Sequence, residues 1–261
     1  GKVQAVKSKY DYQSSDGLTI HGYLTAPKGA DKNNMPLIVL PHGGPESRDD
    51  QAFDWWASFY AARGYLVYQP NFRGSSGYGA AFVSAGLNQW GLKMQDDITE
   101  GVNKLVADGY ADPERICIVG GSYGGYAALA GATLTPDLYQ CVVSVAGISN
   151  LPLLLSEAGK DSIWEKRIGN RFEDSEYINS ISPAKNAENV TAPVLLLHGD
   201  QDVVVPINQS RQMEDALQKA GKPVEFVVLK DEDHWLSRSE TRIEMLARSI
   251  EFIDRHIGNA N

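Results

Sequence analysis

The sequence predicts an α/β fold with a mostly parallel central sheet, helices on both faces and an antiparallel N-terminal lead-in. Short apolar runs alternate along the chain with longer stretches in which apolar residues recur at helical spacing. This alternation is typical of a parallel sheet covered by helices on both sides. The first thirty residues differ, because weak alternation and an Asp16-Gly17 turn dipeptide predict a hairpin there.

Each predicted element follows from a local pattern. The lead-in strands are expected at 8–13 and 19–25, on either side of the turn. Buried strands are predicted where apolar runs are bounded by turn residues, at 37–40, 66–69, 116–119, 141–145, 194–197 and 224–229. Helices are predicted where the apolar period lengthens, at 53–63, 90–107, 123–134, 206–220 and 241–256.

Length and charge limit the classes of function. At 261 residues, residues 1–261 are expected to form one domain with a large core. A net charge of −9 argues against nucleic acid and anionic membranes as partners. No apolar run approaches the ~20 residues that span a bilayer, and no signal peptide is recognisable. These observations favour a cytoplasmic protein and leave its oligomeric state open, a homo-oligomer included.

The two cysteines are expected to be free thiols. Cys117 lies inside one predicted strand and Cys141 opens the next, so both are predicted to be small buried core residues. A disulfide between neighbouring parallel strands would be unusual.

The segment Gly120-Gly121-Ser122-Tyr123-Gly124-Gly125 carries the strongest chemical signal. It joins the strand predicted at 116–119 to the helix predicted at 123–134. Strand, Gly-x-Ser-x-Gly and helix together are the nucleophile elbow of an α/β-hydrolase fold. The sharp turn exposes the serine hydroxyl, and the glycines avoid a collision between strand and helix. Ser122 is therefore predicted to be a nucleophile.

Two partners for Ser122 follow in the order that this fold requires, first an acid and then a histidine. Asp202 follows the strand predicted at 194–197, and His234 follows the strand predicted at 224–229. Because parallel strands deliver their carboxyl ends to one edge of the sheet, all three side chains are expected to meet there. His234 would act as the base, and Asp202 would orient its ring.

Other acids and histidines near these positions fit the roles less well. Asp200 competes with Asp202, whereas Asp231 and Asp233 lie too close to His234 in sequence to orient it. His198 is predicted to be structural, in the turn that precedes Asp202.

An oxyanion hole needs two N–H groups that point at the developing negative charge. One is predicted to come from Tyr123, directly after the nucleophile, and the other from the segment His42-Gly43-Gly44-Pro45. The alternative for that segment is a plain Gly-Pro turn. We favour the catalytic interpretation because this fold keeps its second donor in the loop after that strand.

The region between Val145 and Val194 contains no clear strand. Its scattered apolar residues, Trp164 and Tyr177 among them, form either a helical excursion that packs on the core or part of the substrate pocket. Both interpretations remain open. The Gly-rich segment 71–79 lacks the ending of a phosphate loop, so Arg73 and Tyr78 are expected to brace it. No Cys/His spacing indicates a metal, and no cofactor is expected.

Several of these motifs together resemble the catalytic domain of the prolyl oligopeptidase family of serine peptidases. The likeness covers almost the whole chain and is carried by residues 16–23, 42–45, 71–78, 120–126, 198–206 and 231–238. Within the family it is nearest to the acylaminoacyl-peptidase and dipeptidyl-peptidase branch. It implies the roles given above for Ser122, Asp202, His234 and Tyr123, and it implies that Gly44 supplies the second oxyanion donor. It also implies an N-terminal β-propeller, which is absent from these 261 residues. Either a domain cut from a longer protein, which we favour, or a stand-alone relative is therefore expected.

The expected function is hydrolysis of peptide bonds in short peptides through an acyl-enzyme on Ser122. A carboxylesterase of the same fold is the alternative, since the triad chemistry is identical. A non-catalytic binding protein is disfavoured because all three triad residues are present. The resemblance leaves exo- or endopeptidase specificity and the preferred side chain open.

Overall fold

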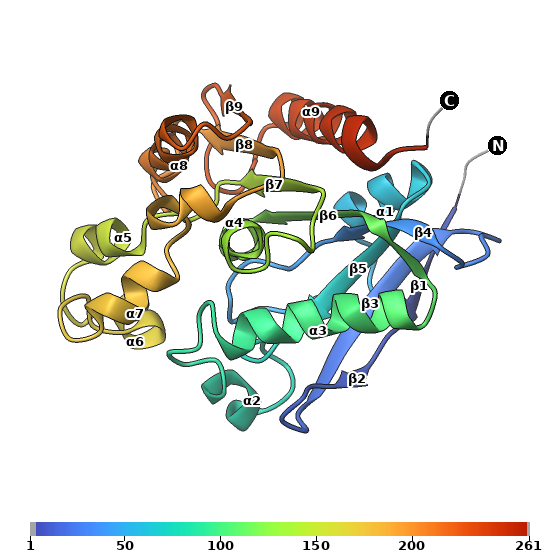
Figure 1. The fold of residues 1–261 in the computed structure, drawn as a ribbon, viewed down its shortest axis with the longest axis horizontal. Coiled ribbons are helices and arrows are strands. Elements are labelled where there is room, and N and C mark those ends of the chain that lie inside the picture. The colour runs from blue at the N-terminus through green and yellow to red at the C-terminus, as the bar shows by residue number, and fades with distance from the viewer. Residues whose placement is uncertain (1–3, 260–261) are drawn as a thin grey trace.

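A nine-stranded mixed sheet runs through the centre of the molecule. In the computed structural model, which describes residues 4–259, its order is β1-β3-β5-β4-β6-β7-β8-β9, and β2 pairs with β3 (Figure 1). The strands are β1 (Ala5–Lys9), β2 (Tyr12–Gln13), β3 (Thr19–Pro27), β4 (Met35–Val39), β5 (Leu66–Asn71), β6 (Ala111–Gly121), β7 (Cys141–Val145), β8 (Val194–Gly199) and β9 (Val224–Leu229).

The directions of the strands confirm the predicted architecture. From β5 through β4, β6, β7 and β8 to β9, every neighbouring pair is parallel. The lead-in is antiparallel, since β1 and β2 pair with β3, and β3 pairs with β5. The single strand predicted at 8–13 is two strands, with an interruption at residues 10–11.

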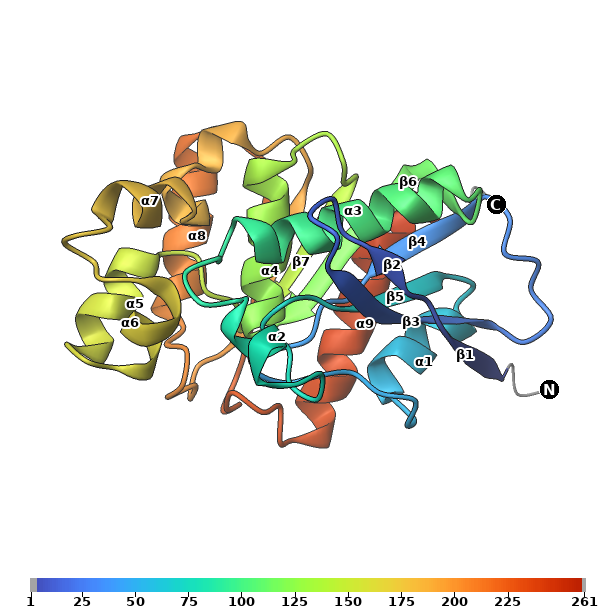
Figure 2. The ribbon, with the colours of Figure 1, turned by 90° about the horizontal axis from the view of Figure 1, so that it is seen from below.

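Helices cover both faces of this sheet (Figure 2). The helices are α1 (Trp55–Ala62), α2 (Ala80–Ser84), α3 (Lys93–Ala107), α4 (Tyr123–Leu134), α5 (Leu151–Ala158), α6 (Ile163–Ile168), α7 (Ser175–Ser180), α8 (Asn208–Lys219) and α9 (Ser239–Ile257). Two short 3₁₀ turns, Pro183–Lys185 and Ala187–Asn189, precede β8. The predicted helices are confirmed, with ends that differ by a few residues.

The sheet separates two hydrophobic cores. Successive side chains of a strand point to opposite faces, so Leu37 and Val39 of β4 pack in the core with α3, α4 and α8. Ile38 and Leu40 pack in the other core, with α1 and α9. A strand buried on both faces is apolar throughout, and this explains the continuous apolar runs in the sequence.

The segment after β7 is a helical excursion. It consists of α5, α6, α7 and the two 3₁₀ turns, and among the described residues it contains no strand. Leu151, Leu154 and Leu155 of α5 and Ile178 of α7 belong to the core on the α3 and α4 side of the sheet. The excursion is therefore packed on the domain.

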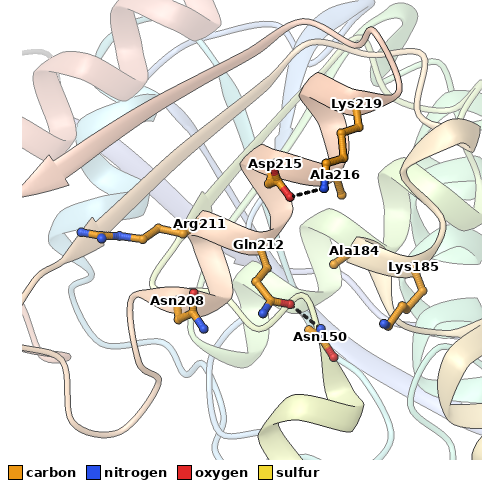
Figure 3. Close-up of a pocket in the computed structure, with 9 residues that line it drawn as sticks. All are labelled: Asn150, Ala184, Lys185, Asn208, Arg211, Gln212, Asp215, Ala216 and Lys219. Carbon is orange, nitrogen blue, oxygen red and sulfur yellow. Dashed lines mark hydrogen bonds and ion pairs between the residues drawn. The ribbon is translucent and has the colours of Figure 1, made fainter.

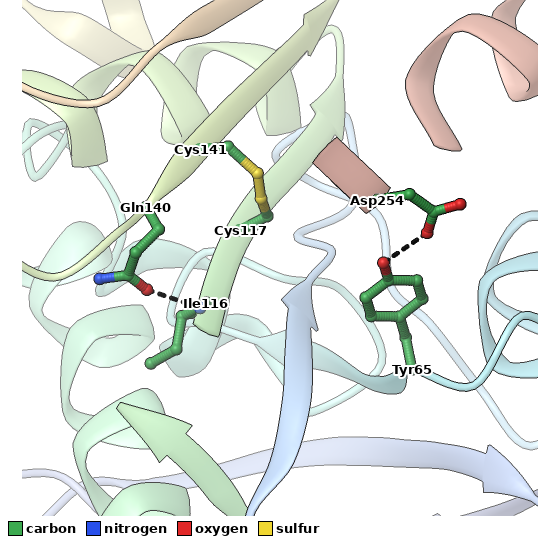
Figure 4. Close-up of a disulfide and its surroundings, with 6 residues drawn as sticks. All are labelled: Tyr65, Ile116, Cys117, Gln140, Cys141 and Asp254. Carbon is green, nitrogen blue, oxygen red and sulfur yellow. Dashed lines mark hydrogen bonds between the residues drawn. A yellow bond between two sulfur atoms is a disulfide. The ribbon is translucent and has the colours of Figure 1, made fainter. Parts of the chain in front are cut away.

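The prediction of two free thiols is wrong in this structure. Cys117 of β6 and Cys141 of β7 form a disulfide (Figure 4). They are direct partners in the parallel register, and their Cα atoms are 4.6 Å apart, within the range that a disulfide can bridge. Both side chains belong to the core on the α9 side, where the register brings them together.

A buried ion pair ties the lead-in to the loop after β5. The guanidinium of Arg73 lies 2.8 Å from the Asp97 carboxylate on α3 and 2.7 Å from Asp16 in the lead-in turn. Tyr78 accepts a hydrogen bond from Asn71 and stacks on the ring of His21. In the structure both Arg73 and Tyr78 brace the Gly-rich loop, as the sequence predicts.

Candidate active site

Ser122 occupies a strained turn between β6 and α4. Its backbone φ is 56° and its ψ is −119°, in a region that non-glycine residues rarely adopt. A hydrogen bond holds the turn against β7, since the Ser122 N–H donates to the carbonyl of Val145 at 2.9 Å. A Cβ on Gly120 would overlap the backbone of Gly124, and one on Gly124 would overlap the carbonyl of Pro41.

Ser122, His234 and Asp202 form a continuous chain of hydrogen bonds. His234 Nε2 lies 3.0 Å from Ser122 Oγ, and His234 Nδ1 lies 2.7 Å from Asp202 Oδ2. A carboxylate only accepts, so Nδ1 carries the ring proton and Nε2 is free to accept the serine hydroxyl. The strands β6, β8 and β9 bring the three residues to one edge of the sheet, as predicted.

The surroundings of Asp202 keep its carboxylate charged. Oδ1 accepts the backbone N–H groups of Val204 at 2.9 Å and Val205 at 2.8 Å. Burial raises the pKa of Asp202, but hydrogen bonds from His198, His234 and Val205 outweigh it and hold the pKa well below its usual range. The competing acid, Asp200, instead accepts the N–H of Asp231 and braces the adjoining turn.

His198 contacts the triad, a contribution that the sequence did not reveal. Its Nε2 lies 2.7 Å from the carbonyl of Val205 and 3.3 Å from Asp202 Oδ2. Since that carbonyl only accepts, Nε2 carries the proton, and Nδ1 accepts the Ser210 hydroxyl at 2.7 Å. The buried ring thus helps to fix the Asp202 carboxylate, in addition to the structural role predicted for it.

The predicted oxyanion donors belong to backbone segments on either side of Ser122. Tyr123 is the first residue of α4, so its N–H has no partner one turn back in the helix. Gly44 adopts a φ of 123°, a left-handed value that favours glycine. Its neighbour Gly43 lies against Ser122, since an added Cβ there would be 3.5 Å from the Ser122 Cβ.

His42 anchors the loop that carries Gly44. Its ring stacks on Phe72 with centroids 4.5 Å apart, and its Nε2 lies 2.8 Å from Ser75 Oγ. Burial lowers the pKa of His42 to about 4, although its hydrogen bond to the Gly43 carbonyl acts in the opposite direction. The ring is therefore neutral at physiological pH. This anchor joins residues far apart in sequence, and no local pattern indicates it.

Trp164 and Tyr177 both contact Trp90, which packs against Tyr123. The rings of Trp90 and Tyr123 are 4.6 Å apart, and Trp164 meets Trp90 edge-on at 6.0 Å. The hydroxyl of Tyr177 donates to the carbonyl of Trp90 at 2.7 Å and holds that turn in place. Both residues are partly buried and reach the catalytic turn through Trp90.

A separate cavity of about 570 Å³ lies between α8 and the segments near Asn150 and Ala184 (Figure 3). Asp215 pairs with Lys219 at 2.9 Å, and Asn150 donates to Gln212 at 2.5 Å. None of the residues that line it belongs to the triad.

Neither a metal-binding cluster nor a membrane-spanning helix is found in the described part of the chain. Within residues 4–259, no group of three or more His, Cys, Asp or Glu side chains is placed to hold a metal ion. None of the helices in that same range has the length and apolar character needed to cross a membrane.

The fold and the site together define a serine hydrolase of the α/β-hydrolase class. The elbow, the order of the three residues and their placement at the carboxyl ends of parallel strands are the features of that class. The chain belongs to the prolyl oligopeptidase family of serine peptidases, whose family model matches residues 51–260.

Known members of the family are similar over nearly the whole chain. A dipeptidyl aminopeptidase BIII from Pseudoxanthomonas mexicana is 36% identical across 99% of this chain and 40% of its own length. A puromycin-hydrolyzing peptidase from Mycobacterium tuberculosis superposes with a TM-score of 0.89 at 30% identity, covering 98% of this chain and 40% of its own. Acylaminoacyl peptidase from Pyrococcus horikoshii superposes with a TM-score of 0.89 at 29% identity. The match covers 99% of this chain and 43% of that protein. This chain therefore spans about two fifths of each.

The state of His42 makes the stability of the fold depend on pH. Its pKa of about 4 in the folded protein lies below the ordinary value of 6.5. As the pH falls, His42 is therefore protonated in the unfolded chain before it is protonated in the folded protein. The stabilising contribution is complete above pH 6.5 and is lost as the pH falls toward 4. The unfolding free energy of wild type is expected to decrease between about pH 7 and pH 4. We expect this decrease to be smaller in His42→Gln, by on the order of 1–3 kcal/mol.

Denaturant unfolding of both proteins across this range measures the effect. Parallel curves of unfolding free energy against pH for wild type and variant would contradict the assignment of a neutral His42 in the folded protein.

Proposed function

We propose that this chain hydrolyses peptide bonds of short peptides through an acyl-enzyme on Ser122. The observation that carries the proposal is the hydrogen-bonded chain Ser122–His234–Asp202 at 3.0 and 2.7 Å. A serine hydroxyl is a weak nucleophile at neutral pH, so a base within hydrogen-bond reach is the requirement that this geometry meets.

In the acylation step, Ser122 Oγ bonds to the carbonyl carbon of the scissile peptide while its proton passes to His234 Nε2. The resulting imidazolium is stabilised by the Asp202 carboxylate, which stays ionised because its pKa is lowered. The C–N bond then breaks, and the proton on Nε2 passes to the departing nitrogen. The amine leaves, and the acyl group remains on Ser122.

In the deacylation step, His234 Nε2 takes a proton from a water molecule that attacks the ester carbonyl. The bond to Ser122 Oγ breaks, the proton returns to that oxygen, and the carboxylic acid departs. The negative oxygen formed in both steps would be held by the N–H groups of Tyr123 and Gly44. This placement fits the first turn of α4, where the helix dipole favours negative charge.

Peptide substrates are supported by the names of the relatives. One similar protein is a dipeptidyl aminopeptidase, and another is an acylaminoacyl peptidase. Both names describe enzymes that act near the amino end of a peptide. We infer that this chain, as part of a protein of similar organisation, acts on short peptides with a free or blocked amino end.

Replacing the nucleophile tests this function. Ser122→Ala and wild type would be compared on p-nitroanilides of acetyl-aminoacyl, aminoacyl and dipeptidyl type and on p-nitrophenyl butyrate. We expect wild type to cleave at least one anilide, and the variant to lose roughly 10⁴-fold or more in kcat/KM because the acyl-enzyme cannot form.

The pattern across the panel separates the alternatives. The anilide that is cleaved identifies the amino end that the site accepts. Ester cleavage without any anilide cleavage would favour the carboxylesterase alternative. Equal rates for wild type and Ser122→Ala on every substrate would contradict the proposal.

We also propose that Trp164 and Tyr177 help to shape the pocket for the side chain before the scissile bond. Their contacts with Trp90, which packs on Tyr123, support this role. We expect Trp164→Ala to change the ratio of kcat/KM between large and small side chains by about tenfold. Phe172→Ala is the matched control, because Phe172 lies in the same excursion but is 73% exposed. An unchanged preference in Trp164→Ala would contradict the proposal.

A further inference from the structure

A cavity of about 190 Å³ lies directly beside the turn that carries Ser122, between the loop after β4 and the N-terminus of α1. Gly121, the residue before Ser122, forms part of its wall. Gly43 forms another part, and an added Cβ there would lie 3.5 Å from the Ser122 Cβ. The wall of the cavity is therefore continuous with the loop and the turn that hold the nucleophile.

The polar side chains of Asp49, Asp54 and Gln69 line this cavity, and each carries side-chain oxygen atoms. Asp49 Oδ2 is buried and has no hydrogen-bond partner among residues 4–259. Gln69 is 1% exposed, and its Oε1 has no donor in the same range. The amide orientation of Gln69 is fixed, since its Nε2 donates to Asp54 Oδ2 at 3.0 Å. Buried acceptors without donors are costly, so a donor or a cation is expected to occupy such a site.

The nearby charges are mostly negative. Asp54 and Asp50 add two carboxylates close to Asp49. The cationic side chain that acts on Asp49 is Lys7 of β1, but its Nζ already donates to the carbonyls of Asp50 and Ala52, each at 2.9 Å. Asp54 Oδ1 accepts the N–H groups of Trp56 and Ala57 in the first turn of α1. The cavity thus combines negative charge with acceptors that lack donors.

We propose that this cavity binds one monovalent cation of the ammonium or potassium class, held by Asp49 and Gln69. Its volume suits such a group with a few waters, since a water occupies about 30 Å³ in the liquid. A divalent ion fits poorly, because Ca²⁺ and Mg²⁺ sites use more anionic oxygens and no cluster of three acids or histidines is present in the described range. The cation is either a free ion or a basic side chain of a bound peptide. The second source rests on the proposed function.

The first arm of the test uses free ions. Melting temperatures would be compared in ammonium, potassium and choline chloride at equal ionic strength, and crystals would be soaked in rubidium. The work would be done at about pH 8.5, above the pKa of about 7 to which burial, with repulsion from Asp54, raises the Asp49 carboxyl. A bound free ion predicts a rubidium peak between Asp49 and Gln69 and a higher melting temperature in ammonium or potassium than in choline.

The second arm uses substrates. Peptide pairs would carry lysine or norleucine on either side of the scissile bond, so that only the ammonium group differs. A bound side chain predicts about tenfold higher kcat/KM for one lysine peptide than for its norleucine partner, the usual effect of one hydrogen-bonded charge.

Matched variants connect either effect to the cavity. Asp49→Asn removes the charge at constant size and is expected to abolish the ion effect or the lysine preference. Asp50→Asn makes the same change at an exposed neighbour, and this variant is expected to retain the effect. If Asp49→Asn fails to fold, the proposal is still tested by wild type alone, through the comparison between ions and the comparison between substrates.

Each outcome has one meaning. An ion effect alone identifies a free ion, and a lysine preference alone identifies a peptide side chain. The absence of both in wild type, or an effect that persists unchanged in Asp49→Asn, overturns the proposal. The ion arm needs no turnover, so it remains informative even if the chain cleaves no peptide.

Discussion

The close contact of backbones around Ser122 is the constraint on which the site depends. The elbow leaves no room for side chains where β6, α4 and the loop after β4 meet, so Gly120 and Gly124 allow a contact that any larger residue would prevent. That contact holds Ser122 at a positive φ, with its Oγ within hydrogen-bond distance of His234. It also sets the distance between Ser122 and the loop that carries Gly44.

The parallel sheet supplies the rest of the geometry. Because β6, β8 and β9 run in one direction, the residues that follow them emerge at the same edge, and side chains 112 and 32 positions apart come within hydrogen-bond distance. The acid is held by more than its histidine partner. The backbone after Asp202 and the ring of His198 fix both carboxylate oxygens, and this limits the positions that His234 can adopt.

The sequence predicted the parts of this protein that local patterns encode. The order of strands and helices follows from apolar period, and the triad follows from three residues that each succeed a predicted strand. The contacts of His42 with Phe72 and Ser75, and of His198 with Asp202, depend on how loops fold over one another, and no spacing reveals them. The Cys117–Cys141 disulfide depends on strand register, which apolar runs leave undetermined.

Ser122 is inferred to be a nucleophile that His234 activates and that Asp202 supports by orienting the histidine ring. Labelling with a fluorophosphonate, followed by mass mapping of the peptides, measures this activation, because an activated serine reacts with the probe far faster than an ordinary hydroxyl. We expect one adduct per chain, on Ser122, which is lost in Ser122→Ala and forms roughly 10³-fold or more slowly in His234→Gln. A folded protein that forms no adduct, or forms it on another residue, would overturn this role for Ser122.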